Sequence, residues 1–218
     1  MALYALLDYD TLKKYDISIK DFCKTAKGLK AKILQYRDKN SNLEDKKKRI
    51  LEIRKYWKKT LIINDTLELL PFCDGIHIGQ EDLEELQKKY NLSPEKIIEK
   101  LRNGEWKIEK NFYFTDVPLN PKKKVGLSTH NKEEIIKANT LPLSYIGLGA
   151  YRPTSTKNTS NILGQKVIDL IKYSYHPVAV IGGVKIYDKI PAKFKVVGSD
   201  ICKLTSIRLR KKKIFKKK

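Results

Sequence analysis

Two short apolar runs in this sequence each lead into carboxylates. Leu61 to Ile63 is followed by Asn64 and Asp65, and Gly75 to Ile78 leads into a segment that contains Asp82. Hard cations such as Mg²⁺ prefer oxygen ligands and are commonly held by one or two carboxylates together with substrate phosphates. If the two runs are neighbouring strands, Asp65 and Asp82 can present such an ion jointly. The alternative is that both are ordinary acids at strand ends or helix caps.

Closely spaced cations follow another apolar run. Arg37 and Lys39 come directly after Ile33 to Tyr36 and stand two positions apart, so both project to the same side of an extended segment. An arginine fork beside a lysine point charge is suited to clamping a pyrophosphate. The alternative is that Arg37 and Asp38 simply form an ion pair at the end of the strand.

Hydroxyl groups follow a later run, just before a predicted helix. Ser128, Thr129 and His130 lead into a helix start signal at Asn131. Free backbone N–H groups at such a start attract anions. His130 is a candidate acid or base, although a lone histidine at a strand-helix junction is more often a structural hydrogen-bonding group. His77 lies within an apolar run and is expected to line the interior.

Three further segments have the composition of phosphate sites. The segment Thr154 to Lys157 joins two threonine hydroxyls, Ser155 between them, and a lysine that can reach a second anion. Glycines after the last two apolar runs, at Gly182–Gly183 and Gly198–Ser199, allow backbone amides to approach a phosphate closely. Barrels of alternating strands and helices often bind phosphate at these two places.

Eight short apolar runs recur along the chain, and amphipathic segments with helix start signals separate several of them. The runs are 3–7, 33–36, 61–63, 75–78, 125–127, 145–148, 177–181 and 194–197. This pattern is typical of parallel strands joined by helical crossovers. Eight units in 218 residues fit a single-domain α/β protein with the (β/α)8 TIM barrel fold. An open doubly wound sheet is the alternative, but polar groups after nearly every run favour the barrel, whose strands open onto one face.

An insertion interrupts the regular spacing between the fourth and fifth runs. Residues 83–124 are longer than one helix needs and carry their own signals. Ser93 to Glu95 predicts a helix start, Asn103–Gly104 predicts its end, and Trp106 to Phe114 alternates like a strand. We expect a decoration on the barrel that suits an oligomer contact, so a homo-oligomer is one expected state.

The C-terminal part of the chain is short of helix and rich in charge. Only about a dozen residues separate Gly183 from Val196, so the final helices are expected to be abbreviated. We place the barrel domain at residues 1–202 and a basic tail at 203–218. The tail holds 9 Lys or Arg and no acid, which leaves 37 basic against 25 acidic residues and lowers the net charge from +21 to +12.

The charge and the cysteines indicate which partners and which redox environment to expect. A positive field favours anionic ligands, from phosphorylated metabolites to RNA. We do not expect nucleic acid as a partner, because Phe215 is the one aromatic residue among the cations of the tail. Cys23, Cys73 and Cys202 have no metal-site spacing and indicate reduced thiols. No apolar run approaches the roughly 20 residues of a membrane span, so we expect a cytoplasmic protein.

Taken in order, the motifs resemble those of the thiamine phosphate synthase family. They are QYRDK, LIIND, GIHIGQED, VGLSTH, YIGLG, PTSTK and AVIGGV. The resemblance covers about Leu3 to Ile201, except for the insertion and the shortened seventh unit. It implies a transferase that joins 4-amino-2-methyl-5-hydroxymethylpyrimidine, carried as its diphosphate, to 4-methyl-5-(2-hydroxyethyl)thiazole phosphate. The products would be thiamine phosphate and pyrophosphate, the partners small phosphorylated substrates, and the cofactor Mg²⁺.

The resemblance also implies a role for each motif residue. The pyrimidine diphosphate would be held by Gln35, Tyr36, Arg37, Asp38, Lys39, Asn64, Ser128 and Lys157. Mg²⁺ would be bound by Asp65 and Asp82. The thiazole phosphate would be held by Thr154, Ser155, Thr156, Gly183, Gly198 and Ser199, and His130 is a possible acid or base.

Two other functions compete with the synthase. Thiazole tautomerases resemble the synthases and also have a histidine at the position of His130, so this residue does not discriminate between them. The cations and the two carboxylates favour the synthase, because a tautomerase needs neither Mg²⁺ nor pyrophosphate. A more remote alternative is a nonenzymatic nucleic-acid-binding protein recruited through its charge, for which steep salt-dependent RNA binding would be the sign.

Overall fold

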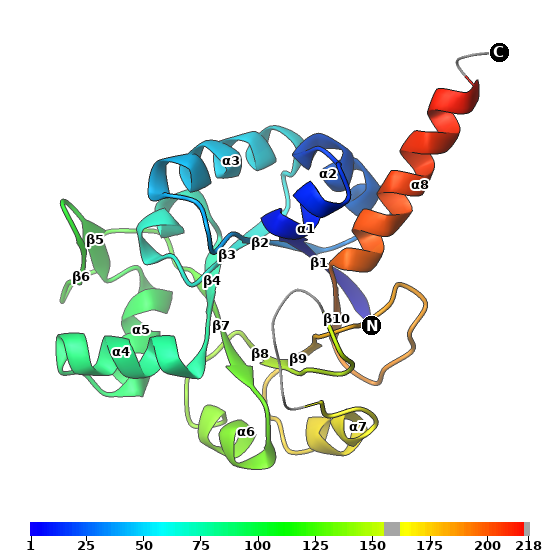
Figure 1. Cartoon of the computed structure of the whole chain (residues 1–218). Coiled ribbons are helices and arrows are strands. Elements are labelled where there is room, and N and C mark those ends of the chain that lie inside the picture. The colour runs from blue at the N-terminus through cyan, green and yellow to red at the C-terminus, as the bar shows by residue number, and fades with distance from the viewer. Residues whose placement is uncertain (155–161, 216–218) are drawn as a thin grey trace.

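Eight parallel strands close into a barrel in the computed structural model of this chain (Figure 1). The structure describes residues 1–154 and 162–215. The barrel strands are β1 (Ala2–Asp8), β2 (Ile33–Arg37), β3 (Thr60–Asn64), β4 (Gly75–Ile78), β7 (Lys124–Thr129), β8 (Tyr145–Leu148), β9 (Val178–Val180) and β10 (Phe194–Val197). Around the ring their order is β1-β10-β9-β8-β7-β4-β3-β2. Each predicted apolar run forms one strand, and the predicted (β/α)8 barrel is confirmed.

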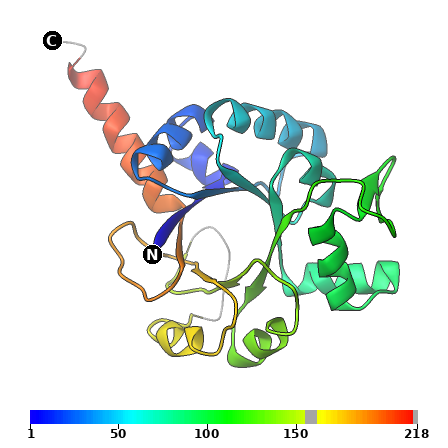
Figure 2. The ribbon, with the colours of Figure 1, turned by 180° about the vertical axis from the view of Figure 1, so that it is seen from behind.

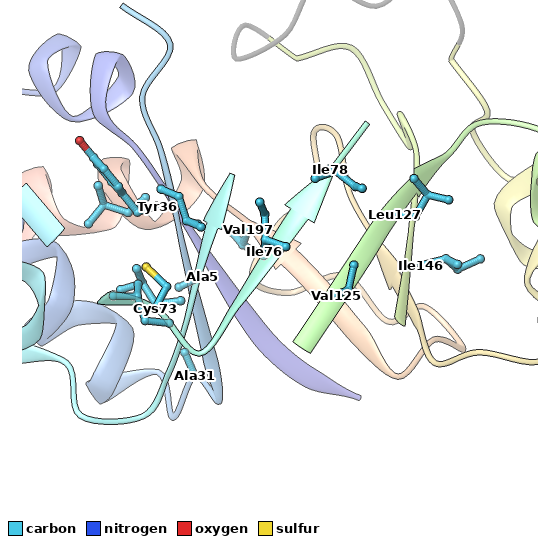
Figure 3. Close-up of a cluster of buried hydrophobic side chains, with 14 of the residues drawn as sticks. Ala5, Ala31, Tyr36, Cys73, Ile76, Ile78, Val125, Leu127, Ile146 and Val197 are labelled. Atoms are coloured by element: carbon cyan, nitrogen blue, oxygen red, sulfur yellow. The ribbon is translucent and has the colours of Figure 1, made fainter. Parts of the chain in front are cut away.

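Side chains along each strand alternate between two apolar layers. On β1, Leu3 and Ala5 belong to the main core between the strands and the surrounding helices, whereas Tyr4 and Leu6 belong to a smaller cluster inside the barrel. Figure 3 shows part of the main core, which includes Ile76 of β4 and Val125 of the adjoining strand β7. Because successive strand residues point to opposite faces, the second layer is free to build the barrel interior.

Helices surround the barrel, and several of them begin at side-chain caps, which include the predicted start at Asn131. They are α1 (Tyr9–Lys14), α2 (Ile19–Gly28), α3 (Leu43–Tyr56), the 3-10 helix η1 (Leu67–Phe72), α4 (Gln80–Tyr90), α5 (Pro94–Asn103), α6 (Lys132–Ala138), α7 (Lys166–Ile171) and α8 (Ser199–Phe215). Ser18 accepts a hydrogen bond from the backbone N–H of Asp21, and Asn131 accepts one from Glu134. Both bonds satisfy N–H groups that lack a partner within the helix. Among the described helices, none is long and apolar enough to cross a membrane.

The insertion between β4 and β7 adds one helix and one hairpin beside the barrel (Figure 1). Helix α5 begins and ends where its start and stop signals predicted. Strands β5 (Trp106–Ile108) and β6 (Phe112–Phe114) pair antiparallel. Trp106 is 1% exposed and stacks on Phe112 with ring centroids 5.9 Å apart. Trp106 and Phe112 belong to the main core, so the insertion packs against the barrel as a decoration.

The expected basic tail is largely helical. Helix α8 runs over Ser199–Phe215, so the predicted boundary at residue 202 falls inside it and the eighth helix is not abbreviated. Its first half is anchored by buried Ile201 and by Thr205, whose hydroxyl donates to Thr25 of α2 at 2.9 Å. Lysine and arginine are good helix formers, so the helix continues past this anchor. Its end extends away from the barrel in both views (Figures 1 and 2).

The connection between β9 and β10 is short, as predicted, and the helix before β9 is short as well. Helix α7 has 6 residues, and residues 181–193, which are all described, contain no helix between β9 and β10. Two lysine contacts tie this connection to its neighbours. Lys195 donates to the backbone oxygen of Asp188 at 3.2 Å, and the Lys185 ammonium lies 3.8 Å from Asp200. Polar contacts thus fix a loop where a barrel usually places a helix.

The three cysteines are buried and unpaired. Burial raises the pKa of the Cys23, Cys73 and Cys202 thiols to about 12. A thiol must lose its proton to act as a nucleophile or metal ligand. The cysteines are therefore packing residues, apart from the chemistry of the chain.

Candidate active site

A cavity of about 370 Å³ opens at the carboxyl ends of the barrel strands. Residues that end or directly follow β2, β3, β4, β7, β8, β9 and β10 line it. In barrels of this type the loops at this end carry the active site. The strand-end residues singled out in the sequence therefore converge on one space.

Most of the predicted site residues line this cavity. They are Gln35, Arg37, Lys39, Asn64, Asp65, Asp82, Ser128, His130, Thr154, Gly183, Gly198 and Ser199. The structure does not bring Tyr36 and Asp38 into the lining. The remaining three, Ser155, Thr156 and Lys157, lie outside the described residues.

Tyr36 and Asp38 belong to the outer layer of the barrel instead. Tyr36 is fully buried in the main core, and its hydroxyl donates to Asp38 at 2.8 Å. Arg49 of α3 pairs with the same carboxylate at 2.8 Å. Burial raises the pKa of Asp38, but hydrogen bonds from Tyr36 and Ser41 outweigh it and the pKa is lowered. Strand alternation explains the error, since Gln35 and Arg37 point inward while Tyr36 points outward.

The two predicted cations line the cavity, and each contacts a carboxylate. The Arg37 guanidinium contacts the Asp8 carboxylate at 2.6 Å, and the Lys39 ammonium lies 3.4 Å from Asp65. Asp8 is 4% exposed and also accepts hydrogen bonds from Thr11 at the start of α1. A buried carboxylate fixed from two sides holds an arginine fork in place. The alternative interpretation, an ion pair between Arg37 and Asp38, is wrong, because the carboxylate that contacts Arg37 is that of Asp8, which the sequence analysis did not name.

The two carboxylates at β3 and β4 lie close enough to repel each other. Burial and then the charge of Asp82 raise the pKa of Asp65 to about 6, while Lys39 opposes the shift. The backbone of Asp65 is left-handed, with φ of 60°, and its N–H donates to the carbonyl of His77 at 3.0 Å. Asp82 accepts from the N–H of Gly79 at 2.6 Å. The backbone of Asp65 and the side chain of Asp82 are therefore fixed at the cavity edge.

This donor set fits a hard cation that takes part of its coordination from a ligand. A cation that binds between two adjoining carboxylates relieves the repulsion of their charges, so its binding is favoured. Within the described ranges, no group of three or more histidine, cysteine or acidic side chains gathers around one point. Asp65 and Asp82 would thus supply two ligands, and phosphate oxygens or water would supply the others, which is a common arrangement of Mg²⁺ sites.

Backbone groups form the opposite side of the cavity. Gly182 and Gly183 have φ of 88° and 62°, a left-handed conformation that glycine adopts without strain. The Arg152 guanidinium grips Asp188 at 2.5 and 3.1 Å and donates to the carbonyl of Gly183. Ser199 opens the 17-residue helix α8 toward the cavity. A helix start beside a glycine turn is suited to a phosphate.

Two histidines approach the cavity from different strands. His130 contacts Glu134 through Nδ1 at 3.0 Å, and both residues are in the lining. His77 contacts the Ser128 hydroxyl through Nε2 at 3.0 Å, and it also lines the cavity, as predicted. The side chain of Gln80 donates to the backbone oxygen of Ser128 at 2.6 Å. Gln80 follows the fourth strand in sequence, and the strand-end pattern offered a signal for it that the prediction did not use.

Comparisons with known proteins point to one family. The family model described as thiamine monophosphate synthase matches residues 9–99 and 116–192, and the stretch that it skips contains the whole β5-β6 hairpin. The thiamine-phosphate synthase of Persephonella marina is 32% identical over 190 residues, which cover 84% of this chain and 77% of that protein. The thiamine-phosphate synthase of Dictyoglomus turgidum is 32% identical over 185 residues, which cover 80% of this chain and 70% of that protein.

A solved structure agrees with the barrel. The thiamine phosphate pyrophosphorylase from Pyrococcus furiosus superposes with a TM-score of 0.63 over 96% of this chain and 94% of its own. Its sequence is 19% identical to this chain, so the likeness supports the fold.

Proposed function

The chain belongs to the thiamine monophosphate synthase family, and from this premise we propose that it makes thiamine phosphate. The substrates would be 4-amino-2-methyl-5-hydroxymethylpyrimidine diphosphate and 4-methyl-5-(2-hydroxyethyl)thiazole phosphate. The observation that carries the proposal is the convergence of cations, paired carboxylates and a glycine turn on one cavity. Such a site suits two phosphorylated substrates side by side.

The reaction exchanges one bond for another at the methylene carbon of the pyrimidine. The bond from this carbon to the diphosphate oxygen breaks, and the pyrophosphate leaves with the electron pair. The lone pair of the thiazole nitrogen then forms the new carbon–nitrogen bond. Little proton transfer is required, so the site chiefly has to bind, orient and neutralise charge.

The residues of β1, β2 and β3 meet this requirement at the leaving group. Arg37 is held by Asp8 before any ligand arrives, so it would contact the diphosphate without reorganisation. Lys39 would turn from Asp65 toward the same oxygens. Bound between Asp65 and Asp82, Mg²⁺ would supply positive charge to the departing pyrophosphate. Gln35, Asn64 and Ser128 would orient the pyrimidine end.

The thiazole phosphate would bind at the opposite side of the cavity. The backbone of Gly183, the start of α8 at Ser199 and the hydroxyl of Thr154 offer donors there. Gly198 lies at the same edge, where a Cβ would stand 3.2 Å from the carbonyl oxygen of Leu6. On the basis of their motif we assign Ser155 and Thr156 to the thiazole phosphate and Lys157 to the pyrimidine diphosphate, although all three fall outside the described residues.

One observation keeps thiazole tautomerase as a second candidate. The His130–Glu134 pair lines the cavity and has the composition of a proton-transfer pair. In the synthase we assign this pair to holding the start of α6, since His130 and Asn131 both contact Glu134. His130→Asn would abolish a tautomerase and leave most of a synthase activity.

The deciding experiment incubates purified protein with both substrates, with Mg²⁺ or with a chelator. We expect thiamine phosphate with Mg²⁺ and almost none with the chelator, measured by chromatography. Lack of product with Mg²⁺ would refute the synthase, and isomerisation of a thiazole carboxylate phosphate would favour the tautomerase. Asp82→Asn should lose metal-dependent turnover, whereas the matched change Asp169→Asn on α7, where the exposed carboxylate pairs with Lys172, should keep it.

The setting of the enzyme is a further part of the proposal. Buried free cysteines support a reducing compartment, and we propose the cytoplasm. Small phosphorylated substrates are the proposed partners, and a homo-oligomer through the 83–124 insertion stays a prediction.

A further inference from the structure

A chain of hydrogen bonds runs from the packed interior of the barrel to the cavity. The hydroxyls of Tyr4 and Tyr145 lie 2.9 Å apart, and the Tyr145 hydroxyl lies 3.1 Å from Nδ1 of His77. On the other side of the ring, Nε2 of His77 lies 3.0 Å from the Ser128 hydroxyl. His77 and Ser128 line the cavity, whereas Tyr4 and Tyr145 do not. The chain thus connects buried groups to a ligand-facing hydroxyl.

Small residues in the neighbouring strands make room for this chain. A Cβ on Gly126 would stand 2.2 Å from the Tyr145 ring, and one on Gly147 would stand 2.9 Å from the His77 ring. The rings of His77 and Tyr145 are stacked, with centroids 5.5 Å apart and planes at 23°. Because any larger side chain at either glycine would displace a ring, the geometry of the chain is fixed by the barrel itself.

The chain can point in one of two directions. A neutral imidazole donates from one nitrogen and accepts at the other, and each hydroxyl has a single proton. In the outward direction Tyr4 donates to Tyr145, Tyr145 donates to Nδ1 of His77, and Nε2–H donates to Ser128. In the inward direction Ser128 donates to His77, His77 to Tyr145 and Tyr145 to Tyr4.

Burial at the inner end selects the outward direction. Tyr4 is 1% exposed, and over residues 1–154 and 162–215 Tyr145 is the hydrogen-bond partner found for its hydroxyl. In the inward direction the Tyr4 proton would have no acceptor, and an unpaired buried donor is costly. Burial also raises the pKa of both tyrosines, so each keeps the proton that it has to donate.

We propose that Tyr145 is a positioning residue that holds His77 in its Nε2–H tautomer and thereby leaves the Ser128 hydroxyl proton free for a ligand. In this arrangement Ser128 accepts from His77 and offers its own hydrogen to the cavity. In the opposite arrangement it would offer only lone pairs, which repel a phosphate oxygen or a ring nitrogen. That the ligand is the pyrimidine diphosphate rests on the proposed function.

The tautomer itself is the first test, and it needs no substrate. The ring nitrogens of His77 are read by ¹⁵N NMR in the ligand-free protein, which has only 3 histidines to assign. We expect the Nε2–H tautomer in the wild type and in Tyr4→Phe, and a mixture of tautomers in Tyr145→Phe. An Nδ1–H tautomer in the wild type would overturn the proposal whether or not the protein is a synthase.

The second test separates positioning from structure by comparing two matched variants. Tyr145→Phe and Tyr4→Phe both remove the buried bond between the two hydroxyls, so we expect both to lower thermal stability, and Tyr145→Phe to lower it more because the Tyr4 proton then has no acceptor. Tyr145→Phe should raise KM for the pyrimidine diphosphate about tenfold, and Tyr4→Phe should change it by less than about twofold. Equal changes of KM in the two variants would overturn the proposal.

A double-mutant cycle shows whether the effect of Tyr145 passes through Ser128. Ser128→Ala removes the hydroxyl whose proton the chain directs. We expect Tyr145→Phe to have no further effect on KM in the Ser128→Ala background, because the two changes remove one interaction. Multiplicative effects in the double variant would mean that Tyr145 acts by another route and would overturn the proposal.

Discussion

Replacement of Asp65 by asparagine should make the metal-free protein more stable and nearly inactive. Asparagine keeps the shape of the side chain, tolerates the left-handed backbone at φ of 60°, and removes one of two repelling charges. Stability and activity are thus expected to change in opposite directions. This is expected for a site in which repulsion between two carboxylates lowers the stability of the metal-free protein but is needed to bind a cation.

The size of the effect follows from the pKa of Asp65. A value of about 6 against an ordinary 3.8 corresponds to roughly 3 kcal/mol lost by the ionised folded state. The side chain is 26% exposed and asparagine gives up the contact with Lys39, so we expect about half of this, or a rise in Tm of about 3–6 °C.

The pH dependence of this effect has a definite sign. A carboxyl group whose pKa is higher in the folded state costs no stability below its unfolded-state value and the full amount above its folded value. The advantage of Asp65→Asn should therefore be near zero at about pH 4, grow between pH 4 and 6, and be complete above about pH 7.

Thermal unfolding in a chelator across this pH range is the assay. The matched control is Asp116→Asn, which removes a fully exposed carboxylate paired with Lys100 and should shift Tm by no more than about 1 °C. Turnover of Asp65→Asn with Mg²⁺ should fall about 100-fold. A variant that is less stable than the wild type at pH 7, or that shows no pH dependence, would refute the proposed repulsion.

Three other changes test separate parts of the molecule. Asp8→Asn removes the buried charge that faces Arg37. It should lower the free energy of unfolding by about 3–5 kcal/mol and raise KM for the pyrimidine diphosphate at least about tenfold. An unchanged KM would contradict the role assigned to Asp8. Arg152→Met should raise KM for the thiazole phosphate about tenfold and leave the other KM unchanged in steady-state kinetics, whereas an equal rise in both would argue against a local effect. Ser93→Ala removes the cap at the N–H of Lys96 and should lower Tm by about 2–4 °C without changing kcat, and lost activity would show that the insertion does more than pack.

The sequence was sufficient to predict the barrel because its signals are local. Each strand is a short apolar run, and residues that follow it must lie at the same end of a parallel barrel. This reasoning placed Asp65, Asp82 and Ser128 in one cavity although they come from three strands. Helix caps are equally local, which is why α5 has the predicted bounds.

The parts that sequence reasoning missed depend on orientation or on distant contacts. The motif from Gln35 to Lys39 was taken as one binding segment, but alternation along β2 turns Tyr36 into the main core. Asp8 meets Arg37 only because β1 and β2 pair in register, across 29 positions. The grip of Arg152 on Asp188 spans 36 positions and has no local signal.

The basic C-terminal segment shows a further limit. Its lysines and arginines were interpreted as a tail because the segment holds 9 of them and no acid. The buried contacts of Ile201 and Thr205 anchor α8, and its cationic continuation then extends a helix that already exists. The composition of the basic segment does not reveal that tertiary contacts of the preceding residues have already nucleated a helix.

A single-turnover reaction tests most directly whether this cavity performs the condensation. Enzyme in excess is mixed with the pyrimidine diphosphate, the thiazole phosphate and Mg²⁺, and thiamine phosphate and pyrophosphate are measured together over time. We expect both products to form in equal amounts, at one rate in the wild type and at a rate at least about 100-fold lower in Asp65→Asn. Pyrophosphate without thiamine phosphate, or equal rates in the two proteins, would contradict the function proposed for this site.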